Sequence, residues 1–499
     1  MCDENFLKDS DVVSGNALDA DPGNSVEIVE KPKFSLFDRE QKSQLSVETQ
    51  KEIKRRTKLF YLISAGNATG QTFLFNFFSA FAVLVGVGSE LLGFITSIRN
   101  LMSSLFQGTI GRMSDKLGRK YFLLLGFFFV FSSIVVLIFI NNPVMLIVIS
   151  IIQAFSLSII IPVWNATLGD VTSMDQRAGY IGKLSALGTI LSVTLMLILA
   201  TIFYLADEVL LGKTILGWIV FIPDKTQYSI AFGLAAFNFL LCLLGAFLLK
   251  ETRIIKEKKQ QPRMFIALKN KDFRKFFIIN SIFGLTMAIM WPLFPIAQVT
   301  ILEMKFAEIA IVNAIFSTCS SLAQYFGGKL SDRIGRKPLI VFGRMGMFVI
   351  PLIMIGAILI DNWLLLIISN VIGGAAMGAM TVSMNAYILD LAPEAQMGAY
   401  TGLTQVGWGI TTFVGSLSAG FIAQPIEAVI GTKMMIVYTF AVISVLRLIT
   451  SFAFFFINES FTLKDRKLLS ERRKAKLDEK YSYDYCYEYT VDDSSIRIK

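Results

Sequence analysis

Long apolar segments separated by short polar stretches form the dominant pattern along the chain. Twelve of these segments are long enough to cross about 30 Å of hydrocarbon as helices. They cover residues 59–85, 89–110, 120–140, 143–168, 177–204 and 228–250 in the first half, and 275–298, 306–327, 338–360, 363–389, 397–423 and 433–457 in the second. The pattern predicts an all-α polytopic membrane protein with 12 transmembrane helices and both chain ends on one side.

Basic residues lie in alternate loops. Lys and Arg gather before the first span (51–58), in the loops 111–120 and 328–337, and in the connection 250–275. The loops on the other side carry little charge, with 206–227 as the exception. Because positively charged loops remain in the cytoplasm, we expect a plasma-membrane protein with both termini cytoplasmic.

The overall composition agrees with this topology. Hydrophobic residues make up 54% of the chain, and Lys and Arg exceed Asp and Glu by 47 to 38, a net charge of +9. The excess charge is spread over alternate loops rather than gathered on one domain among aromatic side chains. We therefore expect the lipid bilayer, and no nucleic acid, as a partner.

Candidate chemistry is sparse. The chain has no histidine, which excludes Ser-His-Asp and Cys-His catalysis, His-ligated zinc and an imidazole proton relay. The four cysteines, Cys2, Cys242, Cys319 and Cys486, are far apart and form no CxxC pair. We expect no catalytic residues, no metal site and no cofactor, so a membrane enzyme is disfavoured.

The two halves of the chain repeat one another. The loop Gly111–Lys120 (GRMSDKLGRK) recurs 217 residues later as Gly328–Lys337 (GKLSDRIGRK). A second set of matches has an offset of 220: Asn165, Ala166, Asp170, Gln176, Tyr180 and Gly182 recur as Asn385, Ala386, Asp390, Gln396, Tyr400 and Gly402. Lys250–Thr252 and Asn458–Ser460 close the two halves alike. Such parallel duplication is typical of transporters, whose substrate site lies between the repeats.

The repeat divides the chain into five parts. We predict a disordered cytoplasmic tail (1–50), an N-terminal six-helix bundle (51–250), a basic cytoplasmic linker (251–274), a C-terminal six-helix bundle (275–458) and a cytoplasmic C-terminal tail (459–499).

The two loops resemble the signature of the major facilitator superfamily, which follows helices two and eight, and the resemblance covers residues of about 55–460. It implies the fold of that family, in which two pseudo-symmetric six-helix bundles rock around a central cavity. It also implies a monomeric secondary active or facilitative transporter of a small solute, working by alternating access. The alternative is a transport-inactive receptor or assembly subunit, which has no need of signature loops in both halves.

The loop residues suit a latch. Gly111 and Gly118 leave room for a tight turn, and Asp115 can meet the positive end of a neighbouring helix, which the resemblance identifies as helix eleven. We expect Arg119 to pair with Asp170. The second-half counterparts are Gly328, Asp332, Gly335 and Arg336, with Arg336 expected to pair with Asp390. The latch would hold the cytoplasmic faces together when the cavity opens outward; alternatively, these residues only form turns and set topology.

The sequence offers no obvious residue that could carry a proton through the membrane. Many drug exporters of this family have an Arg in helix four ahead of a Gln-Gly pair, whereas here Ser150 and Ala154 occupy those positions around Gln153. The Gly-Pro signature of exporters is absent from Gly188–Val193 in helix five. A drug or metabolite:proton antiporter remains the alternative, but facilitated diffusion, exchange or coupling to another ion is favoured.

Arg99 breaks a repeated polar stripe. Thr96, Asn100, Ser103 and Gln107 share one face of helix two, and Asn313, Ser317, Ser320 and Gln324 repeat them in helix eight. Arg99 has Phe316 as its counterpart. A buried cation indicates function by default, so Arg99 is expected either to contact an anionic or strongly hydrogen-bonding solute or to bond to helix carbonyls or the other half.

Other candidates come from the helices that line the cavity in this family. They are Asn67, Gln71, Gln153, Trp291, Gln298 and Gln405, and the alternative for each is hydrogen bonding between helices. Trp291-Pro292 and Pro295 predict a bend in helix seven. Arg344 and Arg447 are expected to snorkel or to pack between outer helices.

Overall fold

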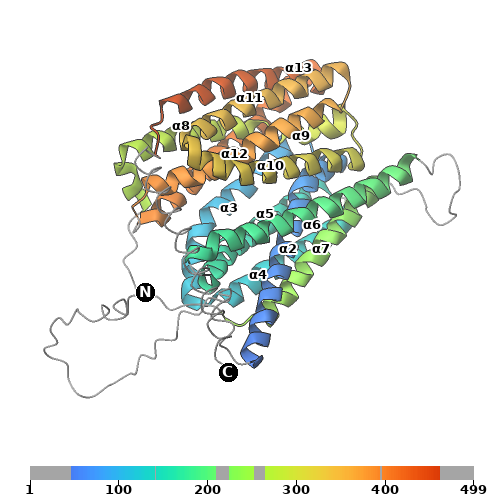
Figure 1. Cartoon of the computed structure of the whole chain (residues 1–499). Helices are drawn as coiled ribbons and strands as arrows, with labels where there is room; N and C mark the ends of the chain where they lie inside the picture. The colour runs from blue at the N-terminus through green and yellow to red at the C-terminus, as the bar shows by residue number, and fades with distance from the viewer. Residues whose placement is uncertain are drawn as a thin grey trace, which may run out of the picture.

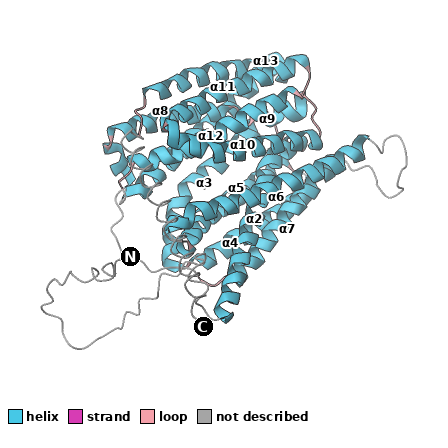
Figure 2. Ribbon diagram, viewed as in Figure 1, coloured by secondary structure: helices cyan, strands magenta, loops and turns pink. Residues whose placement is uncertain are grey.

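The computed structural model describes residues 47–140, 142–172, 174–208, 224–251, 264–393 and 396–460. Throughout these ranges the chain is helical, with short connections and no strand (Figure 2). The tails predicted for 1–50 and 459–499 fall almost entirely outside the described residues, as does most of the linker predicted for 251–274.

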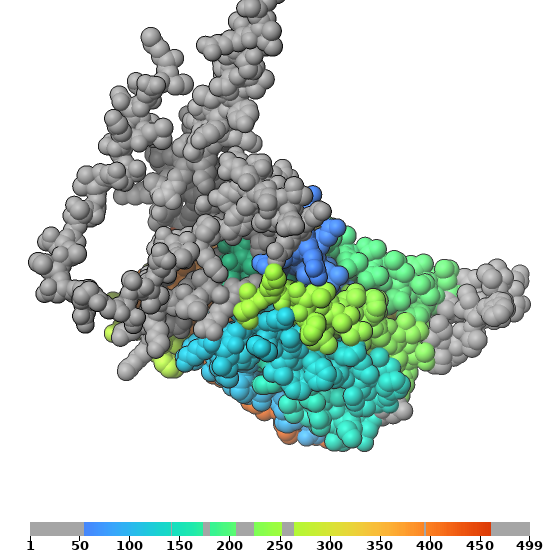
Figure 3. All heavy atoms as spheres, turned by 90° about the horizontal axis from the view of Figure 1, so that it is seen from below, coloured from blue at the N-terminus to red at the C-terminus, as the bar shows by residue number. Residues whose placement is uncertain are grey.

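The first half of the chain forms one bundle. Its helices are α2 (Val47–Leu84), α3 (Ser89–Leu117), α4 (Arg119–Phe139), α5 (Pro143–Val171), α6 (Met174–Glu208) and α7 (Asp224–Leu248). Within it α2 packs on α6 and α7, α3 packs on α5, and α4 packs on α5 and α7. Figure 3 shows the face of this bundle that is seen from below in Figure 1.

The second half repeats this arrangement and lies above the first in Figure 1. Its helices are α8 (Lys271–Ile289), α9 (Leu293–Ile296), α10 (Phe306–Ile334), α11 (Arg336–Ile360), α12 (Leu365–Leu391) and α13 (Met397–Ala453), with short turns η2 (Met264–Lys269), η3 (Ala297–Ile301) and η5 (Phe454–Phe456). α13 contains two successive helices that meet at Gly431, where φ is 78° and ψ is 160°. α8, α9 and the π-helical turn η3 together form one interrupted span.

Among the described residues, nine helical segments are long and apolar enough to cross a membrane. One of these is α13, which contains two predicted spans, and α2 and α3 are long helices that carry more polar residues. The polytopic all-α fold is therefore confirmed. Several boundaries differ: α2 begins at Val47 rather than 59, α3 and α10 extend to Leu117 and Ile334 rather than 110 and 327, and the helix predicted to end at 423 continues to the kink at Gly431.

Local sequence accounts for several helix starts. Asn142 accepts the N–H of Val144 at 2.9 Å, directly before Pro143 opens α5. Asn270 accepts the N–H groups of Asp272 and Phe273 at the start of α8. Both use an amide oxygen to satisfy N–H groups that lack helical partners, and a proline in the first turn has no N–H to satisfy.

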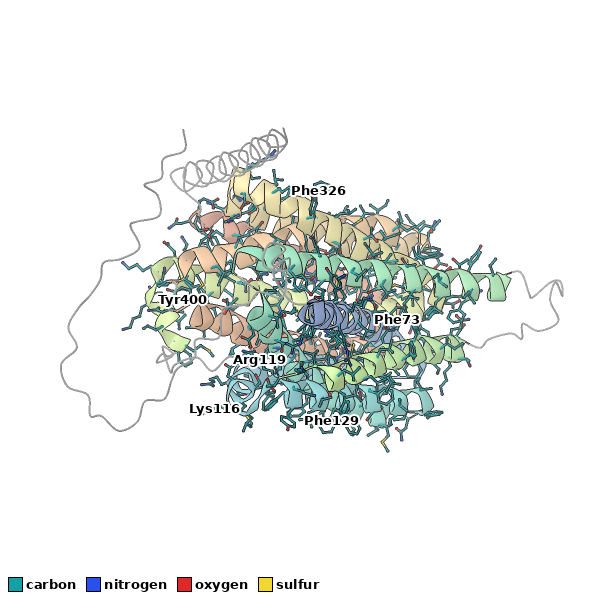
Figure 4. The ribbon with its side chains drawn as sticks, turned by 60° about the horizontal axis from the view of Figure 1, so that its bottom comes forward. Phe73, Lys116, Arg119, Phe129, Phe326 and Tyr400 are labelled. Atoms are coloured by element: carbon teal, nitrogen blue, oxygen red, sulfur yellow. The ribbon has the colours of Figure 1, made fainter. Side chains whose placement is uncertain are left out.

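The two halves meet along two pairs of helices, α3 with α13 and α6 with α10. We call the end of the molecule that carries Gly111–Lys120 and Gly328–Lys337 the motif end, and the opposite end the far end. In Figure 4 Lys116 and Arg119 of the first half and Tyr400 of the second half lie on the same side of the view, which is the motif end.

Candidate functional site

The first signature loop forms a compact ion-pair network. The Nε atom of Arg119 lies 2.5 Å from Oδ2 of Asp170, and its Nη2 lies 3.1 Å from Oδ1 of Asp115. The side chains of Arg119 and Asp170 are 9% and 5% exposed, whereas that of Asp115 is 53% exposed. The structure thus brings Arg119 together with Asp170, and it links the start of α4 to the end of α5.

The second loop repeats the network. Arg336 donates from Nε to Oδ2 of Asp390 at 3.2 Å and from Nη1 to Oδ1 of Asp332 at 2.7 Å. Ser460 adds a hydrogen bond to Asp390 at 3.1 Å. The two copies therefore share geometry as well as sequence.

Two carboxylates at these networks carried only a weak sequence signal. Glu251 accepts the backbone N–H groups of Arg119 (3.0 Å) and Lys120 (3.2 Å) at the start of α4. Glu459 accepts those of Arg336 (2.9 Å) and Lys337 (3.1 Å) at the start of α11. The likeness of Lys250–Thr252 to Asn458–Ser460 marked these positions but gave them no role. Each glutamate caps a helix N-terminus, where a negative charge is favourable.

The glycines of the loops divide into two kinds. Gly118 and Gly335 have φ of 109° and 108°, a region that other residues rarely adopt, and they form the turns between helices. A Cβ atom on Gly118 would also lie 2.8 Å from Oε2 of Glu251. The prediction that Gly111 belongs to the turn is wrong, because Gly111 lies inside α3 and faces Pro162; Gly328 likewise lies inside α10 and faces Val382.

Asp115 pairs within its own half. The resemblance predicted that its carboxylate meets the start of helix eleven, which is the Met397 end of α13. In the described residues Asp115 pairs with Arg119, and Met397 and Gly398 are exposed. The contact between the halves is therefore not made in this conformation.

The halves touch closely towards the far end. A Cβ atom on Gly93 in α3 would lie 2.8 Å from the Cα atom of Gly420 in α13. Ser89 donates to Oε2 of Glu427 at 3.3 Å, and Thr432 donates to Oε1 of Glu427 at 2.7 Å. Small residues permit this approach of two helix backbones, so α3 and α13 are closed together here.

Phe306, the first residue of α10, completes the closure. Its ring lies among aromatic rings of the first half, with centroid distances of 4.5 Å to Phe77 and 5.1 Å to both Phe203 and Tyr228. Phe306 is 1% exposed. This contact ties the second half to α2, α6 and α7.

Towards the motif end the same helices diverge. Gly409 of α13 still contacts Ser104 of α3, but a Cβ atom on Gly108, one turn further along α3, would meet nothing within 4 Å. Gln405, one turn before Gly409, is exposed. The halves are thus closed at the far end and apart at the motif end.

Arg99 lies on α3 against aromatic rings. Its guanidinium carbon is 5.0 Å from the ring centroids of both Phe75 and Phe78. Its Nη2 atom and the Nδ2 atom of Asn100 are buried and have no hydrogen-bond partner in the described chain. The residue is half-buried, and the described residues leave part of its hydrogen-bonding capacity unused.

The other candidates differ in burial and in hydrogen bonding. Gln71 donates to Asn67 at 2.9 Å within α2. Gln153 is fully buried inside the first half, with no partner in the described residues for its amide. Trp291 is half-buried at the break after α8, and Gln298 is buried in η3. Gln405, on the diverging part of α13, is the exposed member of the set.

Arg344 and Arg447 do not snorkel. Their residues are 0% and 1% exposed inside the second half. Arg344 donates to Oδ1 of Asn280 at 2.5 Å, and its guanidinium carbon is 4.1 Å from the Phe283 ring centroid and 4.9 Å from that of Phe454. Both arginines therefore pack between helices, which was the other expectation for them.

Comparisons with known proteins agree with this architecture. The family model described as Major Facilitator Superfamily matches residues 60–275 and again 276–482. An uncharacterized MFS-type transporter of Methanocaldococcus jannaschii is 22% identical over 77% of this chain and 92% of its own length. The multidrug resistance protein MdtG of Proteus mirabilis is 30% identical over 30% of this chain, an alignment that spans about a third (34%) of MdtG.

Solved structures share the fold at low identity. The nucleoside transporter NupG superposes with a TM-score of 0.61 at 13% identity, covering 81% of this chain and 100% of NupG. A bacterial homologue of the human lysosomal transporter Spinster, in an inward-facing and unoccupied conformation, gives a TM-score of 0.61 at 14% identity over 81% of this chain and 97% of its own. Two consecutive family matches, a duplicated helical fold and two signature networks lead to one conclusion: the chain belongs to the major facilitator superfamily and is a multi-pass membrane transporter.

Proposed function

We propose that this chain moves a small solute across the plasma membrane by rocker-switch alternating access, and that the solute carries an anionic or strongly hydrogen-bond-accepting group. The observation that carries the solute class is Arg99, whose Nη2 atom has no partner in the described chain and whose guanidinium lies against two phenylalanine rings. An arginine near mid-membrane is costly unless something pairs with it. A solute anion or acceptor would supply that partner.

The conformation fits one stage of such a cycle. With the motif end on the cytoplasmic side, as the loop charges favour, the closed far end faces outside and the molecule is inward-open. The Asp115 carboxylate, which is 53% exposed beside Arg119, then docks on the start of α13 when the motif end closes. The Arg119–Asp170 and Arg336–Asp390 pairs would hold each half rigid during this movement.

The energy source is proposed from the positions of the acidic residues. Among the described helices, carboxylates lie at or near helix ends, for example Glu90, Asp170, Asp390 and Glu427. The rocker switch therefore runs as facilitated diffusion, exchange or coupling to an ion other than the proton.

A thermal-shift screen on the purified full chain tests the solute class. Small carboxylates, phosphates and nucleosides are compared with cationic dyes, for the wild type, Arg99→Ala and Arg99→Lys. We expect stabilisation by one anionic or acceptor-rich class, lost in Arg99→Ala and partly kept in Arg99→Lys. Undiminished stabilisation of Arg99→Ala by the same ligands would remove Arg99 from the site. Flux of the selected solute in proteoliposomes separates a transporter from a transport-inactive receptor.

A further inference from the structure

Pro351 frees one backbone carbonyl inside the second half. It lies within α11 (Arg336–Ile360) and has no N–H, so the carbonyl of Met347, four residues earlier, loses its helical donor. Met347 and Pro351 are both buried. A carbonyl without a donor is expensive inside a membrane, where no water replaces the missing hydrogen bond.

The break between α8 and α9, inside the seventh predicted span (helix seven), frees a second carbonyl. Pro292 cannot donate to Ala288, and the N–H of Trp291 bonds to Ala288 at 3.2 Å instead of to Met287. Ser416 also donates to the Ala288 carbonyl at 3.1 Å. The carbonyl of Met287 is therefore left without its usual backbone donor at the last turn of α8.

Arg447 supplies donors to both freed carbonyls. Its Nη1 donates to the Met347 carbonyl at 3.1 Å, and its Nη2 donates to the Met287 carbonyl at 3.0 Å. Arg447 comes from the last part of α13 and is 1% exposed. One planar guanidinium with several fixed donors can bridge two acceptors in this way, whereas a single ammonium or amide group is less suited to it.

We infer that Arg447 is a positioning residue that clamps the two proline breaks, and thereby fixes the pivot about which the end of helix seven moves. Beyond the pivot, α9 and η3 pack on α2 of the other half and lead to Phe306 at the far-end closure. When this segment swings as the far end opens, the hydrogen bonds of Arg447 keep the end of α8 in place and the Met287 carbonyl paired. This role goes beyond the proposed solute and needs no substrate to be tested.

A double-mutant cycle separates the clamp from general packing. Pro351→Ala restores an N–H at position 351, so the Met347 carbonyl regains a helical donor. We expect Arg447→Met to lower the thermal unfolding midpoint of the purified full chain by several degrees. In the Pro351→Ala background the same change should lower it by clearly less, because one of the two carbonyls no longer depends on Arg447.

Two matched controls fix the interpretation. Pro162→Ala removes a proline from α5 in the other half, and Arg344→Met removes an equally buried arginine that bonds to the Asn280 side chain. Neither Arg447→Met in the Pro162→Ala background nor Arg344→Met in the Pro351→Ala background should show this rescue. Should Arg447→Met not fold, Arg447→Lys replaces it, since one lysine can satisfy the single carbonyl left in the Pro351→Ala background.

A second readout addresses the pivot itself. Spin labels at Gly88→Cys and Val429→Cys, in a background without the four native cysteines, report the far-end distance between the halves. We expect Arg447→Met to broaden this distance distribution and Pro351→Ala to narrow it again in the double variant. The inference is overturned if Arg447→Met lowers the thermal unfolding midpoint equally in the wild-type and Pro351→Ala backgrounds. It is also overturned if Arg447→Met leaves the spin-label distance distribution unchanged.

Discussion

Phe306 stacks on Phe77 with ring centroids 4.5 Å apart and an interplanar angle of 20°, and this pair joins the second half of the chain to the first. Because the rings come from opposite halves at the far end, the contact exists only while that end is closed. Its energy therefore favours the closed far end and opposes the outward-open state.

Replacing Phe306 by alanine should release this bias. Each aromatic pair contributes about 1 kcal/mol beyond simple burial, and a loss of about 1.4 kcal/mol shifts an equilibrium about tenfold. We expect Phe306→Ala, which removes three such pairs, to raise the far-end-open population at least by that factor, measured by thiol labelling of Ser89→Cys, buried at the closed far end, in a background without the native cysteines. Phe326→Ala is the control, since Phe326 is 62% exposed and projects at the edge of the bundle (Figure 4). An unchanged labelling rate at position 89 would show that Phe306 does not hold the far end.

A valine at Gly93 should prevent closure. Its side chain would collide with the backbone of Gly420, so the helices α3 and α13 could not approach. We expect Gly93→Val to insert normally, to stop solute flux and to leave the far end open to thiol reagents. Gly233→Val on α7, where an added Cβ meets nothing within 4 Å, should retain flux. Full activity of Gly93→Val would contradict the close approach.

Asp115→Asn should act in the opposite direction to Phe306→Ala. Asp115 is 53% exposed in this conformation, so its replacement leaves the far-end-closed state nearly unchanged. The outward-open state, in which the carboxylate would dock on the start of α13, is weakened by about 0.3–1 kcal/mol per charge at a helix terminus. Reduced labelling of the far end and slower transport are expected, with Lys116→Gln as the control. If labelling and transport both match the wild type, the latch is wrong.

The capping glutamates should contribute to stability. Glu251 and Glu459 each accept two backbone N–H groups at a helix start. Loss of the negative charge weakens two charge-assisted hydrogen bonds, at a cost of about 2 kcal/mol. We expect Glu251→Gln and Glu459→Gln to lower the unfolding midpoint by several degrees, whereas the exposed Glu303→Gln should not. If Glu251→Gln and Glu459→Gln unfold at the same temperature as Glu303→Gln, the two caps do not contribute to stability.

The sequence predicted the helices and the two networks, because both depend on local information. Apolar length gives a membrane span directly, and the repeated spacing of Arg119 and Asp170 pointed to their pairing. The continuation of α13 to Gly431 was missed, since Pro425 and Glu427 interrupt the apolar pattern without ending the helix.

Contacts between distant segments could not be predicted in the same way. Nothing near Phe306 in the sequence indicates its partners in α2, α6 and α7, and that contact also depends on the conformation. The hydrogen bonds of Arg447 go to carbonyls that prolines in two other helices leave without donors. The sequence around Arg447 by itself therefore shows only a buried cation and not its partners. Asp115 illustrates a further limit, because its carboxylate pairs with Arg119 in this conformation, whereas its proposed contact with the start of α13 belongs to another state.

Transport by a rocker switch requires the far end to open and close. Ser89 and Glu427 face each other across this end at 3.3 Å, so Ser89→Cys/Glu427→Cys can be joined by a short thiol cross-linker in a background without native cysteines. Flux of the solute selected by the thermal-shift screen is then measured in proteoliposomes before cross-linking, after it, and after cleavage of the linker. We expect cross-linking to stop the flux and cleavage of the linker to restore it. Flux that continues undiminished through the cross-linked protein would contradict alternating access between the two halves.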